Sequence, residues 1–336
     1  MSYRTNNRPL GSPKQLRGVS LIELMLSMAI GLVLLVGVMA VFFNSRTAYH
    51  SSESQVHLLD DGRYALHLLG QDLRMAGSIG QNSWLSGVQG RALDSSPNGG
   101  PLVPLAGDCE PLWYINMDRK VEASNDANPY GGSCIPASYR LGSDVLVVRY
   151  ANATAVSDAD LQVGMTYAQS TLGRSQLFTA GADPTPTFAP DQNHRLEVHA
   201  YYVANFTDAV GDGMPSLHRI SLAPGPRLTD QVVVPGVEDF QVQFGISTCQ
   251  TPPCSGLDQS VNQYVNANAI NWADPLAVNN IFAVKVWVLL RSQTEEQSIN
   301  TDASFNLGGR TLAFVGVDNF RRLLLSSVIQ IRNRGN

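Results

Sequence analysis

Four cysteines are the residues best suited to covalent chemistry in this chain of 336 residues: Cys109, Cys134, Cys249 and Cys254. All four follow a long apolar segment, so the region that carries them is expected to be exported to an oxidising compartment, where an even number of cysteines favours disulfides. Three pairings are possible, and proximity in the sequence favours Cys109–Cys134 and Cys249–Cys254. A metal site built on Cys249 and Cys254 would need two further soft ligands, and no CxxC or HxxxH spacing supplies them. We therefore expect structural disulfides and no metal.

The remaining polar residues give no sign of a catalytic or cofactor site. The six histidines have no HExxH spacing, and the chain contains neither GxxxxGK nor GxSxG. His57 and His67 are expected on a helix, in solvated or packing positions. The segment from Asp208 to Asp212 suits a hairpin loop, and the alternative, a calcium loop, would need more oxygen ligands at fixed spacing. We predict that the protein is not an enzyme and has no cofactor, with a membrane-tethered periplasmic enzyme as the alternative class.

A single carboxylate lies inside the long apolar segment. Residues 19–43 have one charged side chain, that of Glu23. About 20 apolar residues suffice to cross a bilayer as a helix. An acid within the membrane core costs on the order of 2.5–3.5 kcal/mol and usually has a partner. An ordinary signal anchor gives no reason to keep Glu23, and the sequence after Ala40 lacks the small-residue cleavage site of a secretory signal.

The residues before this segment are basic. Arg4, Arg8, Lys14 and Arg17 precede residue 19, and no acid does. By the positive-inside rule, the N-terminus is expected in the cytoplasm and everything after Phe43 on the other side of the inner membrane. Without these first 18 residues, 19 basic and 28 acidic side chains remain, a net charge of −9. Such an acidic product is repelled by phosphate backbones, so we expect no nucleic-acid binding as a bulk property, with a local basic patch as the alternative.

The run from Arg17 to Leu24, RGVSLIEL, resembles the class III signal of type IV prepilins and pseudopilins. The resemblance implies cleavage after Gly18 by a prepilin peptidase on the cytoplasmic face and N-methylation of the new terminus at Val19. The family usually has Phe at that position, so Val19 departs from its commonest choice. The glycine before the cut and the glutamate five residues after it are both present.

Cleavage at Gly18 would place an ammonium group on Val19, about one helical turn from the carboxylate of Glu23. In apolar surroundings, opposite charges on adjacent subunits attract far more strongly than in water. Such a pair can set the axial register of an incoming subunit. We therefore assign Glu23 a role in assembly and none in catalysis.

One long helix must position these residues. No proline occurs between Pro13 and Pro97, and apolar residues continue at helical spacing after the membrane segment, at Val56, Leu59, Leu66, Leu69 and Leu73. A helix from Val19 to about Met75 would be roughly 85 Å long. Gly77 is expected to end it. Gly62 and Gly70 within it are either tolerated glycines or sites of close helix packing.

The remainder of the chain predicts a β-rich domain. Strand patterns occupy residues 144–150, 196–203, 217–222, 237–244 and 281–290. Loop-forming residues dominate between Gly77 and Ser143, which predicts a surface insertion. We expect an α+β, type IV pilin-like fold, with a long N-terminal helix and a C-terminal, mostly antiparallel β-sheet domain. The predicted boundaries are 1–18 for the leader, 19–43 for the transmembrane half of the helix, 44–77 for its amphipathic half and 78–336 for the periplasmic domain.

Three further segments, at residues 55–77, 234–245 and 321–334, resemble the PilW minor pilins and, more loosely, the J-type minor pseudopilins of type II secretion. The resemblance implies a minor pilin of the bacterial inner membrane that enters the pilus and takes part in type IV pilus assembly, priming filaments or forming part of the tip complex. Implied partners are the prepilin peptidase, other minor pilins, the major pilin and a pilus-tip adhesin. The mature chain of 318 residues is larger than the repeating subunits of such filaments, which favours a low-copy role.

Overall fold

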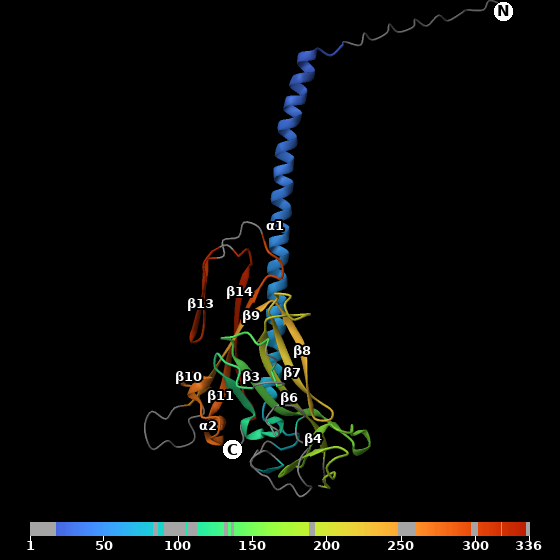
Figure 1. The fold of residues 1–336 in the computed structure, drawn as a ribbon, viewed down its shortest axis with the longest axis vertical. Coiled ribbons are helices and arrows are strands. Elements are labelled where there is room, and N and C mark those ends of the chain that lie inside the picture. Colours follow the sequence, from blue (N-terminus) through green and yellow to red (C-terminus); the bar gives the residue numbers. More distant parts are fainter. Residues whose placement is uncertain are drawn as a thin grey trace, which may run out of the picture. The chain divides into compact units, whose positions relative to one another are not determined.

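The structure is a computed structural model that describes residues 18–82, 87–90, 105, 113–130, 134–135, 138–187, 192–247, 260–296, 302–316 and 318–333. The chain divides into two compact units, Met1–Glu53 and Ser54–Asn336. In the described residues, the first unit contains the N-terminal part of one long helix, and the second contains the rest of that helix and the strands (Figure 1).

The helix α1 spans Leu21–Met75. It ends because Gly77 adopts a φ of +74°, which a side chain would disfavour. A Cβ at this position would also lie 2.7 Å from Lys120. The Gly77 N–H leaves the helix and donates to the carbonyl of Arg149 at 2.9 Å. The predicted stop at Gly77 is therefore confirmed, and the helix end is joined directly to a strand.

In the part of the chain that the structure describes, the larger sheet has eight strands. Their bounds are β1 Val88–Gln89, β2 Val121–Ser124, β3 Val145–Val156, β4 Thr166–Ser170, β5 Ser175–Thr179, β6 Gln192–Ala204, β7 Ser216–Ala223 and β8 Arg227–Pro235. The order is β1-β5-β4-β6-β3-β2, and β7 pairs with both β6 and β8. Strand β6 is thus shared: β4 pairs with its beginning, β7 with its end, and β3 runs along its other edge. All pairs except β1–β5 are antiparallel.

A second sheet has four antiparallel strands in the order β10-β9-β11-β14. Their bounds are β9 Val237–Ile246, β10 Gln263–Asn266, β11 Ile281–Arg291 and β14 Arg322–Gln330. A separate hairpin, β12 Ala303–Leu307 and β13 Arg310–Phe314, packs its apolar side chains on Trp287, Leu289 and Leu324. A short helix, α2 Pro275–Asn279, precedes β11.

The main core lies where the C-terminal part of α1 meets both sheets. Leu58, Ala65, Leu69 and Leu73 of the helix are buried in one cluster with alternate residues of β3, β6, β9, β11 and β14. Because side chains alternate across a strand, one face of each sheet contributes to this core.

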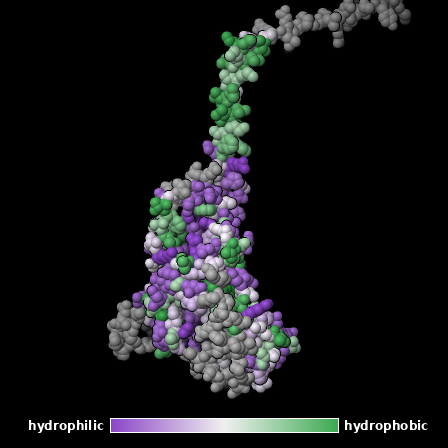
Figure 2. Space-filling model, viewed as in Figure 1, coloured by the Kyte–Doolittle hydropathy of each residue, from purple (hydrophilic) through white to green (hydrophobic). Residues whose placement is uncertain are grey.

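Helix α1 is long enough and apolar enough to cross a membrane. Its most apolar stretch of 18 residues has a mean hydropathy of 2.7, and none of that stretch is buried. Figure 2 shows these apolar side chains along the N-terminal part of α1.

All five predicted strands are present, as β3, β6, β7, β9 and β11. The prediction of a surface insertion between Gly77 and Ser143 is wrong for much of its described part. Trp113, Tyr114, Ile115 and Met117 are buried on the face of the larger sheet opposite the helix, in a second core, and β2 joins the sheet itself. These short segments escape detection because they have turn-rich sequences and no extended periodicity.

Candidate assembly site

The predicted processing residues lie at the beginning of α1. Gly18, Val19 and Ser20 precede the helix, and all three are exposed. The carbonyl of Ser20 accepts from the N–H groups of Glu23 and Leu24, at 3.0 and 3.1 Å, which closes the first turn. Glu23 therefore lies in the first helical turn, where the helix dipole favours a negative charge. Within the described residues, its carboxylate makes no hydrogen bond or ion pair.

The other end of α1 is fixed by a buried carboxylate. Asp72, in the last turn of the helix, is 4% exposed. Its Oδ1 accepts from the Tyr150 hydroxyl at 2.8 Å. Its Oδ2 accepts from the Tyr201 hydroxyl and lies beside Nδ1 of His199, both at 2.5 Å. Helix α1 is thereby attached to β3 and β6 at one point.

These contacts favour the charged form of Asp72. Burial acts to raise the pKa of the carboxyl, but the hydrogen bonds and charge of His199 and the hydroxyls of Tyr201 and Tyr150 outweigh burial and leave the pKa lowered. An anion near a helix C-terminus is opposed by the helix dipole. The three donors compensate for that opposition, so the group can serve as a fixed anchor for the helix.

Helix α1 also approaches the second sheet closely, at Gly62. A Cβ there would overlap the Leu325 side chain of β14 and would lie 3.1 Å from Leu290 Cδ1 of β11. Gly62 is therefore a packing glycine. Gly70 differs, because a Cβ there would meet only the Arg74 side chain, at 3.6 Å or more. Of the two interpretations for these glycines, close packing holds for Gly62 alone.

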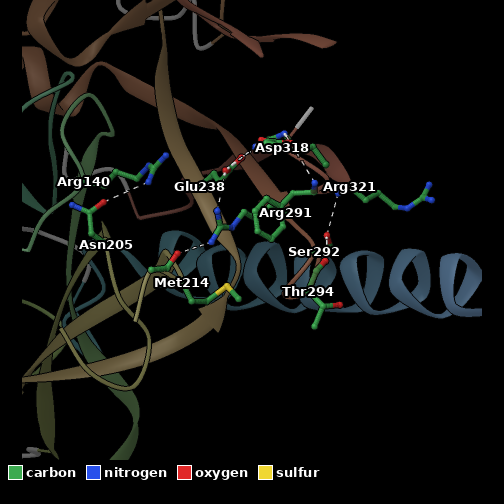
Figure 3. Close-up of polar contacts among 12 residues, drawn as sticks. Arg140, Asn205, Met214, Glu238, Arg291, Ser292, Thr294, Asp318 and Arg321 are labelled. Atoms are coloured by element: carbon green, nitrogen blue, oxygen red, sulfur yellow. Dashed lines mark hydrogen bonds and ion pairs between the residues drawn. The ribbon is translucent and has the colours of Figure 1, made fainter. Parts of the chain in front are cut away.

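Glu238 and Arg322 join two of the three segments that resemble PilW. Arg322 Nε and Nη2 donate to the two carboxylate oxygens of Glu238, at 2.6 and 3.1 Å, and Arg322 also pairs with Asp318. Arg291 lies 3.8 Å from the same Glu238 carboxylate and donates to the Gly213 carbonyl at 2.6 Å. Figure 3 shows Glu238, Arg291 and Asp318 grouped in this way. The pairs fasten β9 to β14 across β11.

Gly236 is the turn residue that makes this arrangement possible. Its φ is +78°, and a Cβ on it would lie 2.7 Å from the Arg291 carbonyl oxygen. The Arg291 N–H donates to the Gly236 carbonyl at 2.7 Å. Only glycine fits this approach, so the Pro-Gly pair at 235–236 passes the chain from β8 in one sheet to β9 in the other.

Asp144 links the same two sheets at another point. Its carboxylate, one residue before β3, accepts from the N–H groups of Asp126 and Val242, both at 2.8 Å. Burial raises the pKa of Asp144 to about 7 despite those two donors, and the nearby charges of Asp126 and Asp239 add to the rise. Burial likewise raises the pKa of Asp239 to about 6, against the lowering effects of Gln241 and Arg310. Neither carboxyl had been singled out in the sequence.

Of the four cysteines, Cys134 lies within the described residues. It is 5% exposed and disulfide-bonded. Cys109, Cys249 and Cys254 lie outside the described residues, so the pairings Cys109–Cys134 and Cys249–Cys254 stay predictions.

The segment from Asp208 to Asp212 was predicted to be a hairpin loop, with a calcium loop as the alternative. It is a hairpin loop, between β6 and β7. The Asp212 carboxylate accepts from four backbone N–H groups, those of Met214, Thr207, Asp208 and Ala209, between 2.8 and 3.2 Å. These bonds, chiefly the one from Met214, lower the pKa of Asp212 to about 2. The Asp212 carboxylate thus holds the loop by accepting hydrogen bonds from its backbone N–H groups. Because these N–H groups carry partial positive charge and occupy the carboxylate oxygens, the arrangement disfavours binding of a cation.

Sequence reasoning missed the partners of two histidines. His199 contacts Asp72, and His218 Nδ1 lies 3.0 Å from Asp230 on the neighbouring strand β8. Both histidines are buried in strands. Each histidine lies on a predicted strand. The aspartate that it contacts is distant in the sequence or on another strand, and only the folded chain brings the two side chains together. His57 and His67 are exposed on α1, as predicted.

Comparison with protein families gives two matches. Residues 200–333 match the family Type IV Pilus-assembly protein W, PilW. Residues 14–39 match the prokaryotic N-terminal methylation motif. No curated protein sequence and no solved structure matches the chain. The first match contains Glu238 and Arg322, and the second contains Gly18, Val19 and Glu23, so the chain is PilW-like over residues 200–333 and has the N-terminal motif of a type IV pilin.

Proposed function

We propose that this chain is a minor pilin that primes type IV filaments or lies near their tip, after cleavage between Gly18 and Val19. The observation that carries the proposal is the carboxylate of Glu23. It is exposed on an apolar helix and makes no hydrogen bond or ion pair with the described residues.

An unpaired carboxylate in a membrane helix is costly, so a partner must come from another molecule. The ammonium group that cleavage would create on Val19 of a neighbouring subunit has the matching charge. In apolar surroundings, the attraction between this ammonium group and the Glu23 carboxylate is large only when the two groups are close together and well aligned. It can therefore select one axial register for the incoming helix.

The size of the globular part supports a low-copy position. Beyond the helix the chain has roughly 260 residues, which correspond to a radius of gyration of about 18 Å. Domains of that size on every helix of a closely packed shaft would crowd their neighbours. Near the end of a filament this crowding is relieved.

The proposal places the N-terminus in the cytoplasm, the apolar part of α1 in the inner membrane and the β-rich domain in the periplasm until the subunit enters the pilus. Its partners there would be the prepilin peptidase, other minor pilins, the major pilin and a tip adhesin. The basic leader and the apolar part of helix α1 support this orientation.

Two variants separate processing from assembly. Gly18→Glu should leave the precursor uncut, because the peptidase site has no room for a side chain. Glu23→Ala should be cleaved and inserted but should reduce filament number sharply, and Glu23→Asp should recover part of the loss. Mass spectrometry of the N-terminus reports the first step, and filament counts by electron microscopy report the second. Wild-type filament numbers with Glu23→Ala would refute the assembly role.

Deletion and labelling test the low-copy position. Deletion should reduce filament number while the major pilin accumulates in the membrane, and a labelled chain should mark filament ends. Continuous label along the shafts, at a level comparable with the major pilin, would overturn the proposal.

A further inference from the structure

Strand β14 has a free edge. It pairs with β11 along all nine of its residues, from Ala283↔Gln330 to Arg291↔Arg322, without a register shift. In the part of the chain that the structure describes, no strand pairs with its second edge.

The direction of its backbone groups follows from two hydrogen bonds. Ser292 N–H donates to the Arg321 carbonyl at 2.8 Å, and Ile331 N–H donates to the Phe282 carbonyl at 2.9 Å. Opposed pairs in an antiparallel ladder alternate between bonded and non-bonded, so the odd-numbered residues of β14 bond to β11. The N–H and C=O groups of the even-numbered residues therefore point to the free edge: Leu324, Ser326, Val328 and Gln330.

The other long edge strand has features that block strand addition, and within the described residues β14 has none of them between Leu323 and Gln330. Strand β8 also has nine residues, but it carries a register shift against β7, ends at Pro235 and exposes Arg227 and Asp230. Strand β10, at the opposite side of the smaller sheet, has only four residues. Proline, charge, irregularity and shortness are the usual means of blocking an edge. Residues 323–330 contain no proline and no charged residue.

The β12–β13 hairpin covers Leu324 near the beginning of this edge, and the exposed part of the edge is Ser326, Val328 and Gln330. Val328 is 53% exposed and Ser326 is exposed, while Leu323 and Leu325 on the α1 side are only partly buried. An added strand with apolar residues at alternate positions would extend the main core beside Leu323 and Leu325. It would also cover Val328 from the other face.

The charge at one end of the edge indicates the chemistry of the partner. Residues 321–333 include three arginines and no acid. Arg321 and Arg322 are paired with Glu296, Glu238 and Asp318. Arg332, just after β14, is exposed and makes no ion pair with the described residues. An acidic residue on the incoming segment would complement it.

We propose that the free edge of β14 binds an extended segment of a different pilus subunit, which adds to the four-stranded sheet as a fifth strand. The segment has alternating apolar residues and an acid at the end beside Arg332. Main-chain hydrogen bonds supply affinity in this mode of recognition, and the alternate side chains supply specificity. The choice of a pilus subunit as partner rests on the proposed function.

The test uses the full chain, coexpressed with the other pilus subunits and purified in detergent. Val328→Pro removes one edge donor without removing a bond to β11, and edge positions of this kind tolerate proline. Val328→Thr is the matched control, because it keeps the N–H and the β-branched shape. Loss of this edge hydrogen bond should reduce copurification of the partner about tenfold, while Val328→Thr should stay within about twofold of the wild type.

Hydrogen exchange of the wild-type chain gives a second measurement that does not depend on the variant's folding. The amides of Leu324, Ser326, Val328 and Gln330 should exchange slowly in the complex and fast in the chain alone. Equal exchange in both states would overturn the proposal, as would unchanged copurification of a folded Val328→Pro variant.

A benzoylphenylalanine cross-linker at Ser326 identifies the occupant. Cross-linking to a second copy of this chain would contradict the assignment to a different subunit, and cross-linking to a strand of another pilus subunit would support it. Filament counts after deletion test the proposed function separately. Normal counts combined with protected edge amides would refute that function and leave strand addition in place.

Discussion

The Asp72 carboxylate on α1 accepts a hydrogen bond of 2.5 Å from the Tyr201 hydroxyl on β6, 129 residues later in the chain. Tyr150 and His199 contact the same carboxylate. The anchor that holds the helix against the larger sheet is therefore a single acid with three partners from two strands.

Removal of this acid should destabilise the domain. Asp72→Ala leaves the hydroxyls of Tyr150 and Tyr201 buried without their acceptor, at a cost of about 1–3 kcal/mol for each unsatisfied group. Asp72→Asn keeps one acceptor oxygen and should cost less. Urea unfolding of the full chain in detergent measures both. An Asp72→Ala variant as stable as the wild type would contradict the anchoring role.

The same acid predicts a loss of stability at low pH. Because the pKa of Asp72 is lowered in the folded chain, its contribution is present above the unfolded value of 3.8 and disappears as pH falls through the folded value. The stability of the wild type should therefore fall more steeply below about pH 4 than that of Asp72→Asn. Thermal midpoints across this range test the difference, and parallel curves would argue against it.

Asp144 and Asp239 predict the opposite slope at higher pH. Their raised pKa values, about 7 and about 6, mean that the folded state holds protons that the unfolded state has already released. Their contribution is greatest below pH 3.8 and is lost as pH rises toward 7. We expect Asp144 alone to account for a decrease of roughly 3 kcal/mol in the free energy of unfolding between pH 4.5 and 7.5. Asp144→Asn should flatten the profile, whereas the exposed Asp208→Asn should leave it unchanged.

Glu238 and Arg322 should show strong coupling. Glu238→Leu leaves the guanidinium of Arg322 in a buried position with Asp318 as its remaining ion-pair partner, which should cost about 3 kcal/mol. The double variant with Arg322→Leu removes both charges and should be less destabilised than the sum of the single variants by more than 1 kcal/mol. Chemical unfolding of the four proteins gives the coupling energy. If the free-energy changes of the two single variants simply add up to that of the double variant, the Glu238–Arg322 ion pair has no coupling energy.

Two glycines of α1 should respond in opposite directions to the same substitution. Gly62→Ala forces a methyl group into the Leu325 side chain and should cost about 1–3 kcal/mol. Gly70→Ala meets only the flexible Arg74 side chain and should stabilise the helix by up to ~1 kcal/mol. The two variants control for each other in one thermal-shift experiment. Equal shifts would show that helix propensity alone decides both.

Several features are local and could be predicted from the sequence. The length of α1, its stop at Gly77 and the position of Glu23 in an apolar stretch depend on neighbouring residues, and the structure agrees with that helix. The strands at β3, β6, β7, β9 and β11 were predictable because each has a regular alternation or a buried apolar run. Strand β14 was missed as a strand, although its segment was recognised as PilW-like.

The tertiary structure decided how these elements meet. The Asp72–Tyr201 and Glu238–Arg322 contacts join residues 129 and 84 positions apart, and no spacing rule connects them. The burial of Trp113 and Tyr114, in a segment that has the composition of a surface loop, depends on the face of the sheet beneath them. Helical and strand periodicity arise from the repeat of the backbone, whereas pairing across a core depends on which faces the whole chain brings together.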